Sequence, residues 1–301
     1  MGGFYEQICG ALGNDNVLTA EPMSRHTTFR AGGEAKYFLT PRDTDGLKEA
    51  IDLCKRSGIP HYILGNGSNL LVGDKGYPGA VISMEAFLEC KVEDTQIRAG
   101  AGVLLSKIAR TAAEHSLAGF EFASGIPGTL GGAMVMNAGA YGGECRDVVK
   151  RVQVLDRQGL IRWLSLEEMD FGYRKSCIGP EGHVVLSAEL TLEKGDKEEI
   201  LARMGELAAK RREKQPLEYP SAGSTFKRPP GHFAGKLIEE AGLKGVSVGG
   251  AQVSTKHSGF VVNTGGATAA DILNLCRLVQ EEVMRRFGVR LELEVKTIGE
   301  F

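Results

Sequence analysis

The sequence predicts an α+β protein, and three observations support this fold class. Hydrophobic residues make up 42% of the 301 residues, which is enough to bury the cores of two or three domains. Strand-like and helical segments follow one another irregularly, without the repeated alternation that a parallel βαβ sheet requires. A charged amphipathic helix over 195–216 changes the character of the chain and marks the start of a further domain.

The part of the chain before residue 195 contains both helices and strands. A helix is predicted over 43–56, where apolar residues recur on one face and Gly58-Ile59-Pro60 ends it. A second helix is predicted over 103–115, with Leu104, Ile108 and Ala112 facing inward. Runs of β-branched and apolar residues predict strands at 61–64, 80–84, 148–156 and 183–193.

The part after residue 195 begins with a helix whose apolar face consists of Ile200, Met204, Leu207 and Ala208. We interpret Arg211 and Arg212 as part of the solvated face of this helix. A long helix opened by Thr268, with Asp271 in a capping-box position, ends at Gly288. The other elements expected here are a helix near 233–241 and strands at 250–253, 259–262 and 289–298.

Charge and cysteine usage exclude several classes of protein. The 36 basic and 38 acidic residues give a formal net charge of −2, so neither a nucleic acid nor an anionic membrane is an expected partner. The N-terminal segment lacks the pattern of a secretory leader, and no stretch approaches the roughly 20 apolar residues of a membrane span. These two absences predict a cytoplasmic location. The six cysteines have no C-x-x-C spacing, which predicts reduced thiols, mostly in the core, and no metal site.

Two glycine-rich bands are the most informative part of the sequence. The first reads Gly65-Asn-Gly-Ser-Asn-Leu70 and falls short of the dinucleotide fingerprint, since Leu70 replaces the third glycine. The second, ASGIPGTLGGAMVMNAGAYGGE over 123–144, contains no Lys or Arg, so it could hold an anion only by backbone N–H groups. Pro127 suits the first turn of a helix.

Two interpretations of these bands are open. A single band of this kind could be a close-packed loop without a ligand. Two bands, each after an apolar segment, favour a long ligand such as a dinucleotide.

Together with later motifs, these bands resemble the UDP-N-acetylenolpyruvoylglucosamine reductases. The motifs occur in the family's order and extend the resemblance over residues 20 to 299. They read LGNGSNLLV, SGIPGTLGGAMVMNAGAYGGE, FGYRKS, YPSAGSTFKRP, AGKLIEEAGLKG, SGFVVN and LELEV.

The resemblance implies a two-subdomain FAD-binding fold of the vanillyl-alcohol-oxidase/PCMH type plus a C-terminal α+β substrate-binding domain. The expected domains are 1–83 and 84–195 for FAD and 196–301 for substrate. FAD would be bound non-covalently, with NADPH as co-substrate and no obligate protein partner. The residues that the resemblance assigns to FAD are Gly65, Asn66, Gly67, Ser68, Asn69, Leu70, Ser124, Gly125, Ile126, Pro127, Gly128, Gly131, Gly132 and Asn137.

The resemblance also implies a reaction and its catalytic residues. Hydride from the flavin N5 would add to the enolpyruvyl ether of UDP-N-acetylglucosamine and give UDP-N-acetylmuramate, a peptidoglycan precursor. Arg174 and Glu294 would stabilise the charge that develops at the carboxylate, and Ser224 would supply the proton. Lys214 and Lys227 are the expected substrate-binding residues, although Lys227 could instead be an exposed loop lysine.

Two departures and two alternatives accompany this assignment. Between YRKS and the next strand the chain has only CIGPEG, so it resembles the second type of the family, which lacks a tyrosine-loop insertion. At residue 266 the chain has glycine, where members of the family commonly have asparagine. One alternative is an oxidase or dehydrogenase of small alcohols on the same FAD fold. The other is a non-catalytic nucleotide-binding protein.

Overall fold

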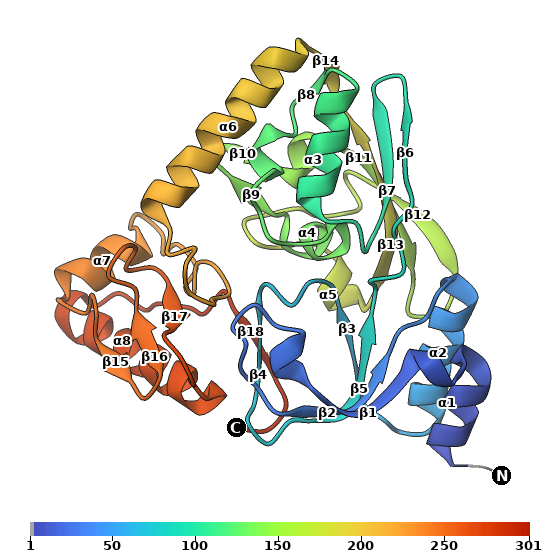
Figure 1. Cartoon of the computed structure of the whole chain (residues 1–301), viewed down its shortest axis with the longest axis horizontal. Coiled ribbons are helices and arrows are strands. Elements are labelled where there is room, and N and C mark those ends of the chain that lie inside the picture. Colours follow the sequence, from blue (N-terminus) through green and yellow to red (C-terminus); the bar gives the residue numbers. More distant parts are fainter. Residues whose placement is uncertain (1–2) are drawn as a thin grey trace. The chain divides into compact units, whose positions relative to one another are not determined.

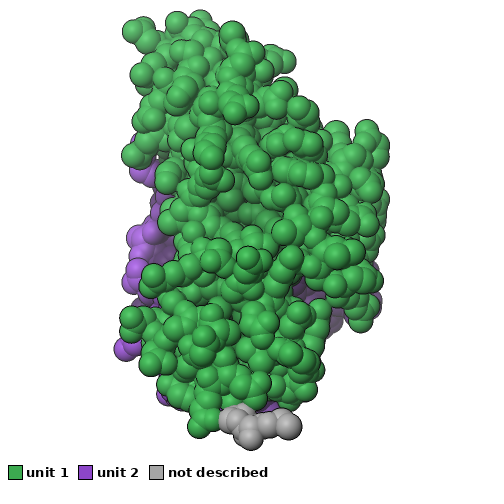
Figure 2. Space-filling model, turned by 90° about the vertical axis from the view of Figure 1, so that its right-hand side faces the viewer, with its two compact units in different colours: residues 1–18, 38–66, 81–211 green, residues 19–37, 67–80, 212–301 purple. Residues whose placement is uncertain are grey.

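The computed structural model describes residues 3–301, so Met1 and Gly2 of the N-terminal segment lie outside the description. The chain divides into two compact units, each built from three stretches of sequence. Unit 1 comprises the residues up to 18, 38–66 and 81–211, and unit 2 comprises 19–37, 67–80 and 212–301 (Figure 2). The three-domain division expected from the sequence stays a prediction about which parts serve cofactor and substrate.

Unit 1 is built on a five-stranded antiparallel sheet with the strand order β12-β11-β13-β7-β6. Two helices lie against this sheet, α3 (Leu105–Glu114) and α4 (Leu130–Met136) (Figure 1). The predicted strands over 148–156 and 183–193 are confirmed as β11 and β13. The strands are β6 (Cys90–Glu93), β7 (Gln96–Gly100), β11 (Val149–Leu155), β12 (Ile161–Ser165) and β13 (Val184–Thr191).

Helix α3 confirms the prediction over 103–115 with one correction. Ile108 and Ala112 are buried as expected. Leu104, expected to face inward, is 42% exposed because it precedes the first helical turn, and Leu105 takes the buried place. Helix α2 (Thr44–Arg56) confirms the helix predicted over 43–56.

A second sheet has the strand order β1-β2-β5-β3, and the chain passes from one unit to the other within β1, β2 and β5. The segments expected at 61–64 and 80–84 are confirmed as β3 and as the end of β5. Its strands are β1 (Val17–Pro22), β2 (Glu34–Leu39), β3 (His61–Leu64) and β5 (Tyr77–Ser83).

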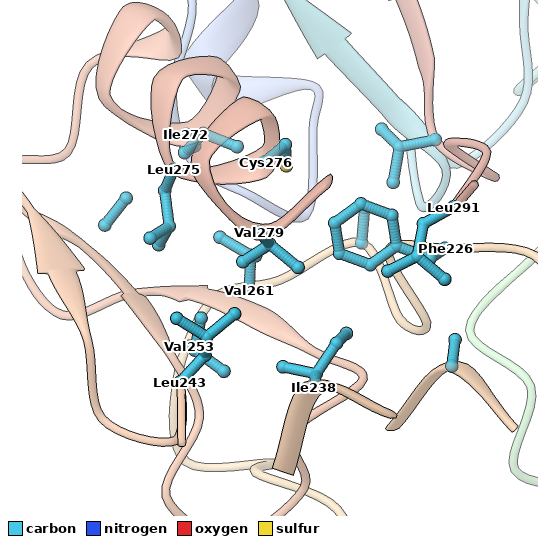
Figure 3. Close-up of a cluster of buried hydrophobic side chains, with 14 of the residues drawn as sticks. Phe226, Ile238, Leu243, Val253, Val261, Ile272, Leu275, Cys276, Val279 and Leu291 are labelled. Atoms are coloured by element: carbon cyan, nitrogen blue, oxygen red, sulfur yellow. The ribbon is translucent and has the colours of Figure 1, made fainter. Parts of the chain in front are cut away.

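Unit 2 has its own core, in which α8 (Ala269–Phe287) packs against a three-stranded sheet and against α7 (Ala234–Glu240). In Figure 3 side chains of α8 such as Ile272, Leu275 and Val279 lie beside Val253 and Val261 of the sheet. The predicted elements of this part are confirmed, except that the expected strand over 289–298 is regular only over its last residues, as β18. The strands are β15 (Ser247–Val248), β16 (Ala251–Val253), β17 (Val261–Asn263) and β18 (Lys296–Ile298).

The remaining elements are short, apart from α6, which confirms the amphipathic helix over 195–216. Within residues 3–301 no helix combines the length and the apolar character of a membrane span. These elements are α1 (Phe4–Leu12), β4 (Leu70–Val72), β8 (Leu117–Ala118), β9 (Gly139–Ala140), β10 (Gly143–Glu144), α5 (Ile178–Glu181), β14 (Glu193–Lys194) and α6 (Lys197–Lys214).

The N-terminus of α8 is capped as the sequence predicts. The Thr268 hydroxyl accepts a hydrogen bond from the Asp271 N–H at 3.0 Å, and the Asp271 carboxylate accepts one from the Thr268 N–H at 3.1 Å. Asp74 adds two further bonds, from the N–H groups of Ala269 and Ala270 at 2.7 and 2.8 Å. These interactions fix the first turn of the helix that carries the unit 2 core.

We expect Thr268→Ala to lower the free energy of unfolding by about 1 kcal/mol, the usual cost of losing an N-cap hydroxyl. The midpoint of thermal unfolding should fall by roughly 2 to 4 °C. Thr268→Ser is the matched control, since it keeps the hydroxyl and should stay within about 0.5 kcal/mol of the parent. Equal destabilisation by both changes in a chemical denaturation series would contradict the capping role.

Candidate active site

The two glycine bands meet within unit 1. The Asn66 side chain donates a hydrogen bond from Nδ2 to the Pro127 carbonyl at 2.7 Å. A Cβ atom added to Gly65 would clash with the Thr129 hydroxyl. Thr129 is buried, and its Oγ1 has no hydrogen-bond partner among residues 3–301. The Gly65 backbone, which has no side chain, therefore lies directly beside the buried Thr129 hydroxyl, which has no hydrogen-bond partner in the described residues.

The helix of the second band begins later than the sequence suggested. Pro127 was expected in its first turn, but α4 begins at Leu130 with Thr129 as N-cap. Gly128 and Thr129 are held in an extended pairing, because the Gly128 carbonyl accepts from the Leu105 N–H at 3.0 Å and Thr129 forms a bridge with Leu104. The stretch Ser124–Gly128 is therefore a loop.

The first band continues into unit 2 as Gly67–Leu70. Gly67 has a φ of +59°, and a Cβ there would clash with the His26 carbonyl, so only glycine fits. Leu70 begins β4 and is buried. A strand follows this turn instead of a helix, which explains why the third glycine of the dinucleotide fingerprint is absent.

Backbone N–H groups of the first band are unused in the fold. Among the backbone hydrogen bonds of residues 3–301, none is donated by Asn66, Gly67 or Ser68. Successive unpaired N–H groups in a glycine turn are a usual way to hold phosphate oxygens. Such groups fit an anionic ligand such as a dinucleotide.

Arg211 lies beside the second band, and its interpretation as part of a solvated helix face is wrong. Arg211 is half-buried, and a Cβ added to Gly125 would lie 2.5 Å from its Cδ. Burial lowers the pKa of the Arg211 guanidinium, while Tyr141 acts in the opposite direction. Arg212 is exposed as expected. The structure thus places a cation beside a glycine loop that has none of its own.

The other residues predicted to bind FAD are divided between the units. Asn137 differs from the rest, since it is fully buried and both hydrogens of its side-chain amide go to protein acceptors. Unit 1 contains Gly65, Asn66, Ser124, Gly125, Ile126, Pro127, Gly128, Gly131, Gly132 and Asn137, and unit 2 contains Gly67, Ser68, Asn69 and Leu70.

Arg174 lies at the tip of a tight turn in unit 1. Gly172 and Lys175 exchange backbone hydrogen bonds at 3.0 and 3.2 Å, which leaves Tyr173 and Arg174 as the turn residues. Arg174 has a φ of +54°, an unfavourable conformation for a residue with a long side chain. Its guanidinium donates a hydrogen bond from Nη2 to the Gly139 carbonyl at 3.1 Å. The turn therefore presents a cation whose direction is fixed.

Ser224 and Glu294 are brought together within unit 2. The Glu294 N–H donates to the Thr225 carbonyl at 2.9 Å, and Phe226 and Leu293 form an antiparallel bridge. Ser224 is exposed at the end of this pairing, after Gly223 with a φ of +74°. The Asn69 side chain donates a hydrogen bond to the Glu294 carbonyl at 3.2 Å, so the first glycine band contacts the segment that contains Glu294.

The two predicted substrate-binding lysines have different surroundings in unit 2. The Lys227 ammonium lies 3.2 Å from the Glu292 carboxylate, an exposed ion pair. Lys214 is the last residue of α6 and is exposed. The Lys227 cation is thus engaged by Glu292, while Lys214 is available to a ligand.

Histidines and cysteines behave as structural residues. Burial lowers the pKa of His257, and its Nδ1 accepts a hydrogen bond from the Gly259 N–H at 3.1 Å. The six cysteines are not paired with one another, and Cys54, Cys145, Cys177 and Cys276 are buried, as expected for thiols that lie mostly in the core. Burial raises the pKa of the Cys145 thiol to about 12. Among residues 3–301 no group of three or more His, Cys, Asp or Glu could hold a metal ion.

Comparison with known proteins identifies two regions of the chain. One family model, described as the C-terminal domain of UDP-N-acetylenolpyruvoylglucosamine reductase, matches residues 215–298. Another, described as an FAD binding domain, matches residues 35–165. FAD is therefore the cofactor. The cofactor-binding expectation for Gly65, Asn66 and the second band falls within the FAD match.

Relatives of known name cover nearly the whole chain. A UDP-N-acetylenolpyruvoylglucosamine reductase from Caldanaerobacter subterraneus is 55% identical over 93% of this chain and 93% of its own. One from Clostridioides difficile is 51% identical over 98% of each. The crystal structure of the Thermus caldophilus enzyme has a TM-score of 0.80 and 40% identity, covering 94% of this chain and 98% of that one.

A more remote solved structure supports the fold class. p-Cresol methylhydroxylase with bound substrate has a TM-score of 0.50 at 13% identity, covering 97% of this chain and 65% of that one. The chain therefore has the FAD-binding fold of the vanillyl-alcohol-oxidase/PCMH type, joined to a C-terminal α+β domain. With this fold, an FAD site and near full-length relatives of one name, the chain belongs to the UDP-N-acetylenolpyruvoylglucosamine reductases, FAD-dependent oxidoreductases of peptidoglycan precursor synthesis.

Proposed function

We propose that the protein uses NADPH to reduce UDP-N-acetylglucosamine enolpyruvate to UDP-N-acetylmuramate. The observation that carries this proposal is the pairing in unit 2 that holds the Ser224 loop against the segment of Glu294. A potential proton donor and a carboxyl group, from segments 70 residues apart in the sequence (294 − 224), are thereby fixed in one short structure. An exposed Ser224 can reach a substrate, as a proton donor must.

Cofactor binding is proposed for the glycine bands, with residues 1–83 and 84–195 serving FAD and 196–301 serving the substrate. The unused N–H groups of Asn66, Gly67 and Ser68 would hold pyrophosphate oxygens. In unit 1, the unused Thr129 hydroxyl beside Gly65 is a further group that could bind the cofactor. Bound FAD, once reduced by NADPH, supplies from its N5 the hydride that adds to the outer carbon of the enolpyruvyl group.

The chain itself would stabilise charge and supply a proton. Hydride addition places negative charge on the carboxylate side of the substrate, and Arg174 and Glu294 are proposed to stabilise it there, as cation and as hydrogen-bonding acid. Ser224 would then donate a proton to the inner carbon. The hydride and this proton together convert the enolpyruvyl ether into the lactyl ether, and the serine recovers its proton from solvent.

Substrate binding is proposed for Lys214 and Lys227. The exposed Lys214 ammonium would meet the diphosphate of the sugar nucleotide as a point charge. The Lys227 ammonium would act on the substrate only by leaving Glu292, with which it forms an exposed pair of small energetic value. We also propose that NADPH and the sugar nucleotide use one pocket in turn. A cytoplasmic location and the absence of an obligate protein partner stay predictions.

An assay of NADPH oxidation tests the proposed function. NADPH consumption should depend on added UDP-N-acetylglucosamine enolpyruvate under anaerobic conditions, and the product should be heavier by two hydrogen atoms. With NADPH deuterated at the transferred position and ordinary water, deuterium should appear in the product methyl group, up to one atom when transfer from the flavin is faster than exchange of its N5 hydrogen with water. Turnover with a simple alcohol, or NADPH consumption that needs only oxygen, would favour the oxidase alternative instead.

We expect Gly65→Ala to weaken FAD binding by at least about tenfold, because the new methyl group displaces the Thr129 hydroxyl from the place where the two bands meet. FAD fluorescence quenching measures the dissociation constant. If the effect is steric, Thr129→Ala should restore part of the affinity in the double variant. Equal loss in the single and double variants would show that the contact with Thr129 is not the cause.

A further inference from the structure

We infer that Asn137 is a positioning residue, which holds the Arg174 turn through its side-chain amide instead of contacting the cofactor. This inference rests on the proposed function, in which Arg174 acts on the substrate. All the residues that carry it belong to unit 1.

The Asn137 side chain has no donor left for a ligand. One amide hydrogen goes to the Glu144 carboxylate at 3.0 Å, and the other goes to the Gly172 carbonyl at 3.2 Å. Its Oδ1 accepts from the Arg146 N–H at 3.0 Å. An asparagine amide has two hydrogens, so both are used within the protein. With an exposed fraction of 0%, the side chain is also closed to solvent.

The left-handed backbone conformation at residue 137 favours asparagine or glycine. Asn137 is the C-cap of α4 and has a φ of +41° and a ψ of 58°, the left-handed region. Apart from glycine, asparagine is among the residues that adopt this conformation most readily. The helix thus ends where its last side chain can turn toward the segment 172–176.

Three hydrogen bonds attach the Arg174 turn to the end of α4. Asn137 holds the Gly172 carbonyl, and Ser176 donates from Oγ to the Val135 carbonyl at 2.9 Å. The third bond is the one from the Arg174 guanidinium to the Gly139 carbonyl. The bonds from Asn137 and Ser176 lie on either side of Arg174, so they fix the turn at both ends.

The Asn137 bond has the most direct effect on Arg174. Gly172 is the residue whose backbone closes the turn with Lys175, and the φ of +54° at Arg174 must be maintained by its surroundings. Glu144 and the Arg146 N–H fix the orientation of the amide that holds Gly172. Without the amide, the turn can relax and move the guanidinium away from its place.

A double-mutant cycle between Asn137 and Arg174 tests the inference. Asn137→Gly keeps the left-handed backbone and removes all side-chain bonds. In single-turnover reoxidation of reduced enzyme by UDP-N-acetylglucosamine enolpyruvate, we expect Asn137→Gly to slow the rate by roughly 10- to 100-fold, the cost of a misplaced catalytic group. In an Arg174→Ala background the same change should cost less than about threefold, because the group it positions is gone. FAD affinity and flavin reduction by NADPH should change less than about threefold in every variant.

Two further variants keep the test decisive. Asn137→Ala also removes both donors and adds no charge beside Glu144, so it should show the same dependence on Arg174 if the glycine variant does not fold. Glu144→Gln leaves the bond to Gly172 in place and should slow the reaction less than about threefold.

Three results would overturn the inference. Loss of FAD in both Asn137 variants would make Asn137 a cofactor residue. Equal slowing of the reaction with and without Arg174 would show that Asn137 acts independently of it. Normal activity of the Arg174→Ala single variant would show that the reaction does not need Arg174. Asn137 would then have no catalytic group to position, and the proposed role of Arg174 would also be rejected. Loss of FAD in the Asn137 variants, with Arg174→Ala still slow and still loaded with FAD, would leave that proposed role unaffected.

Discussion

Ser224→Ala is expected to slow the reoxidation of reduced enzyme by the sugar nucleotide roughly 10²- to 10⁴-fold, the usual contribution of a positioned general acid. Flavin reduction by NADPH should stay within about twofold of the parent, since only the second half-reaction needs this proton. Anaerobic stopped-flow absorbance measures both rates in one protein. The separation of the two rates is the diagnostic feature.

Two comparisons distinguish chemistry from structure at this position. Ser224→Cys keeps a proton on the side chain and should retain more activity than the alanine variant. Ser247→Ala changes another exposed serine of unit 2, one that donates to the Gly245 carbonyl at 3.4 Å, and should be nearly silent. An equal slowing of both half-reactions in Ser224→Ala would mean that this serine maintains the loop and donates no proton.

Arg174→Ala should slow the same half-reaction by roughly 10²- to 10³-fold, as expected when a donor aimed at developing charge is removed. Because the role is electrostatic, Arg174→Lys should recover part of the loss, but not all of it, since a lysine cannot reproduce the guanidinium geometry. The affinity for FAD should be unchanged. Single-turnover rates with saturating sugar nucleotide separate this effect from weaker binding.

Lys175→Ala is the matched control for Arg174. Lys175 lies in the same turn, but its ammonium pairs with the exposed Asp170 at 2.7 Å, so its loss should change the rate less than about threefold. If Lys175→Ala and Arg174→Ala were equally slow, the turn as a whole would matter and the guanidinium would have no special role.

The helices followed from the sequence because their signals are local. In α8 the residues that cap the first turn, the apolar stripe and the terminal Gly288 are all within one stretch, and the structure places each as predicted. The same holds for α2, where the Asp43 side chain accepts from the Gly46 N–H at 2.8 Å. Local hydrogen bonds and periodicity are sufficient to predict such elements.

Several strands were missed, either because their own residues form no strand-like pattern or because their partners are distant in the sequence. β6 alternates half-buried and exposed residues and carries no apolar run, yet it forms the edge of the unit 1 sheet beside β7. β7 in turn pairs with β13, so that Gln96 lies opposite Thr191. β4 pairs in parallel with β18 at the end of the chain, Leu70 opposite Lys296. Such pairings of residues far apart leave no local signal.

The candidate site could be predicted residue by residue, but its supporting contacts could not. The sequence placed Ser224 and Glu294 in separate motifs, and only the structure shows the hydrogen bond from the Glu294 N–H to Thr225 beside them. The signal for Arg211 was present, since it follows Met204, Leu207 and Ala208 at helical spacing and so lies on the apolar face of α6. The prediction that Arg211 is solvated rested on its charge and did not take its position on this face into account.

Asn137 shows a different limit of sequence reasoning. The resemblance to the family assigned Asn137 to the FAD site, together with the glycine band in which it lies. The hydrogen bonds to Glu144 and Gly172 join segments up to 35 residues apart (172 − 137), and no local pattern encodes them. Buried polar side chains are usually hydrogen-bonded, but the sequence does not say to which partner.

The most direct test of the central claim is an anaerobic visible spectrum of the purified protein, recorded after NADPH and then after UDP-N-acetylglucosamine enolpyruvate. We expect a flavin absorption band at about 450 nm that disappears with NADPH and returns when the sugar nucleotide is added. A reduced flavin that is reoxidised by air and not by the sugar nucleotide would contradict it.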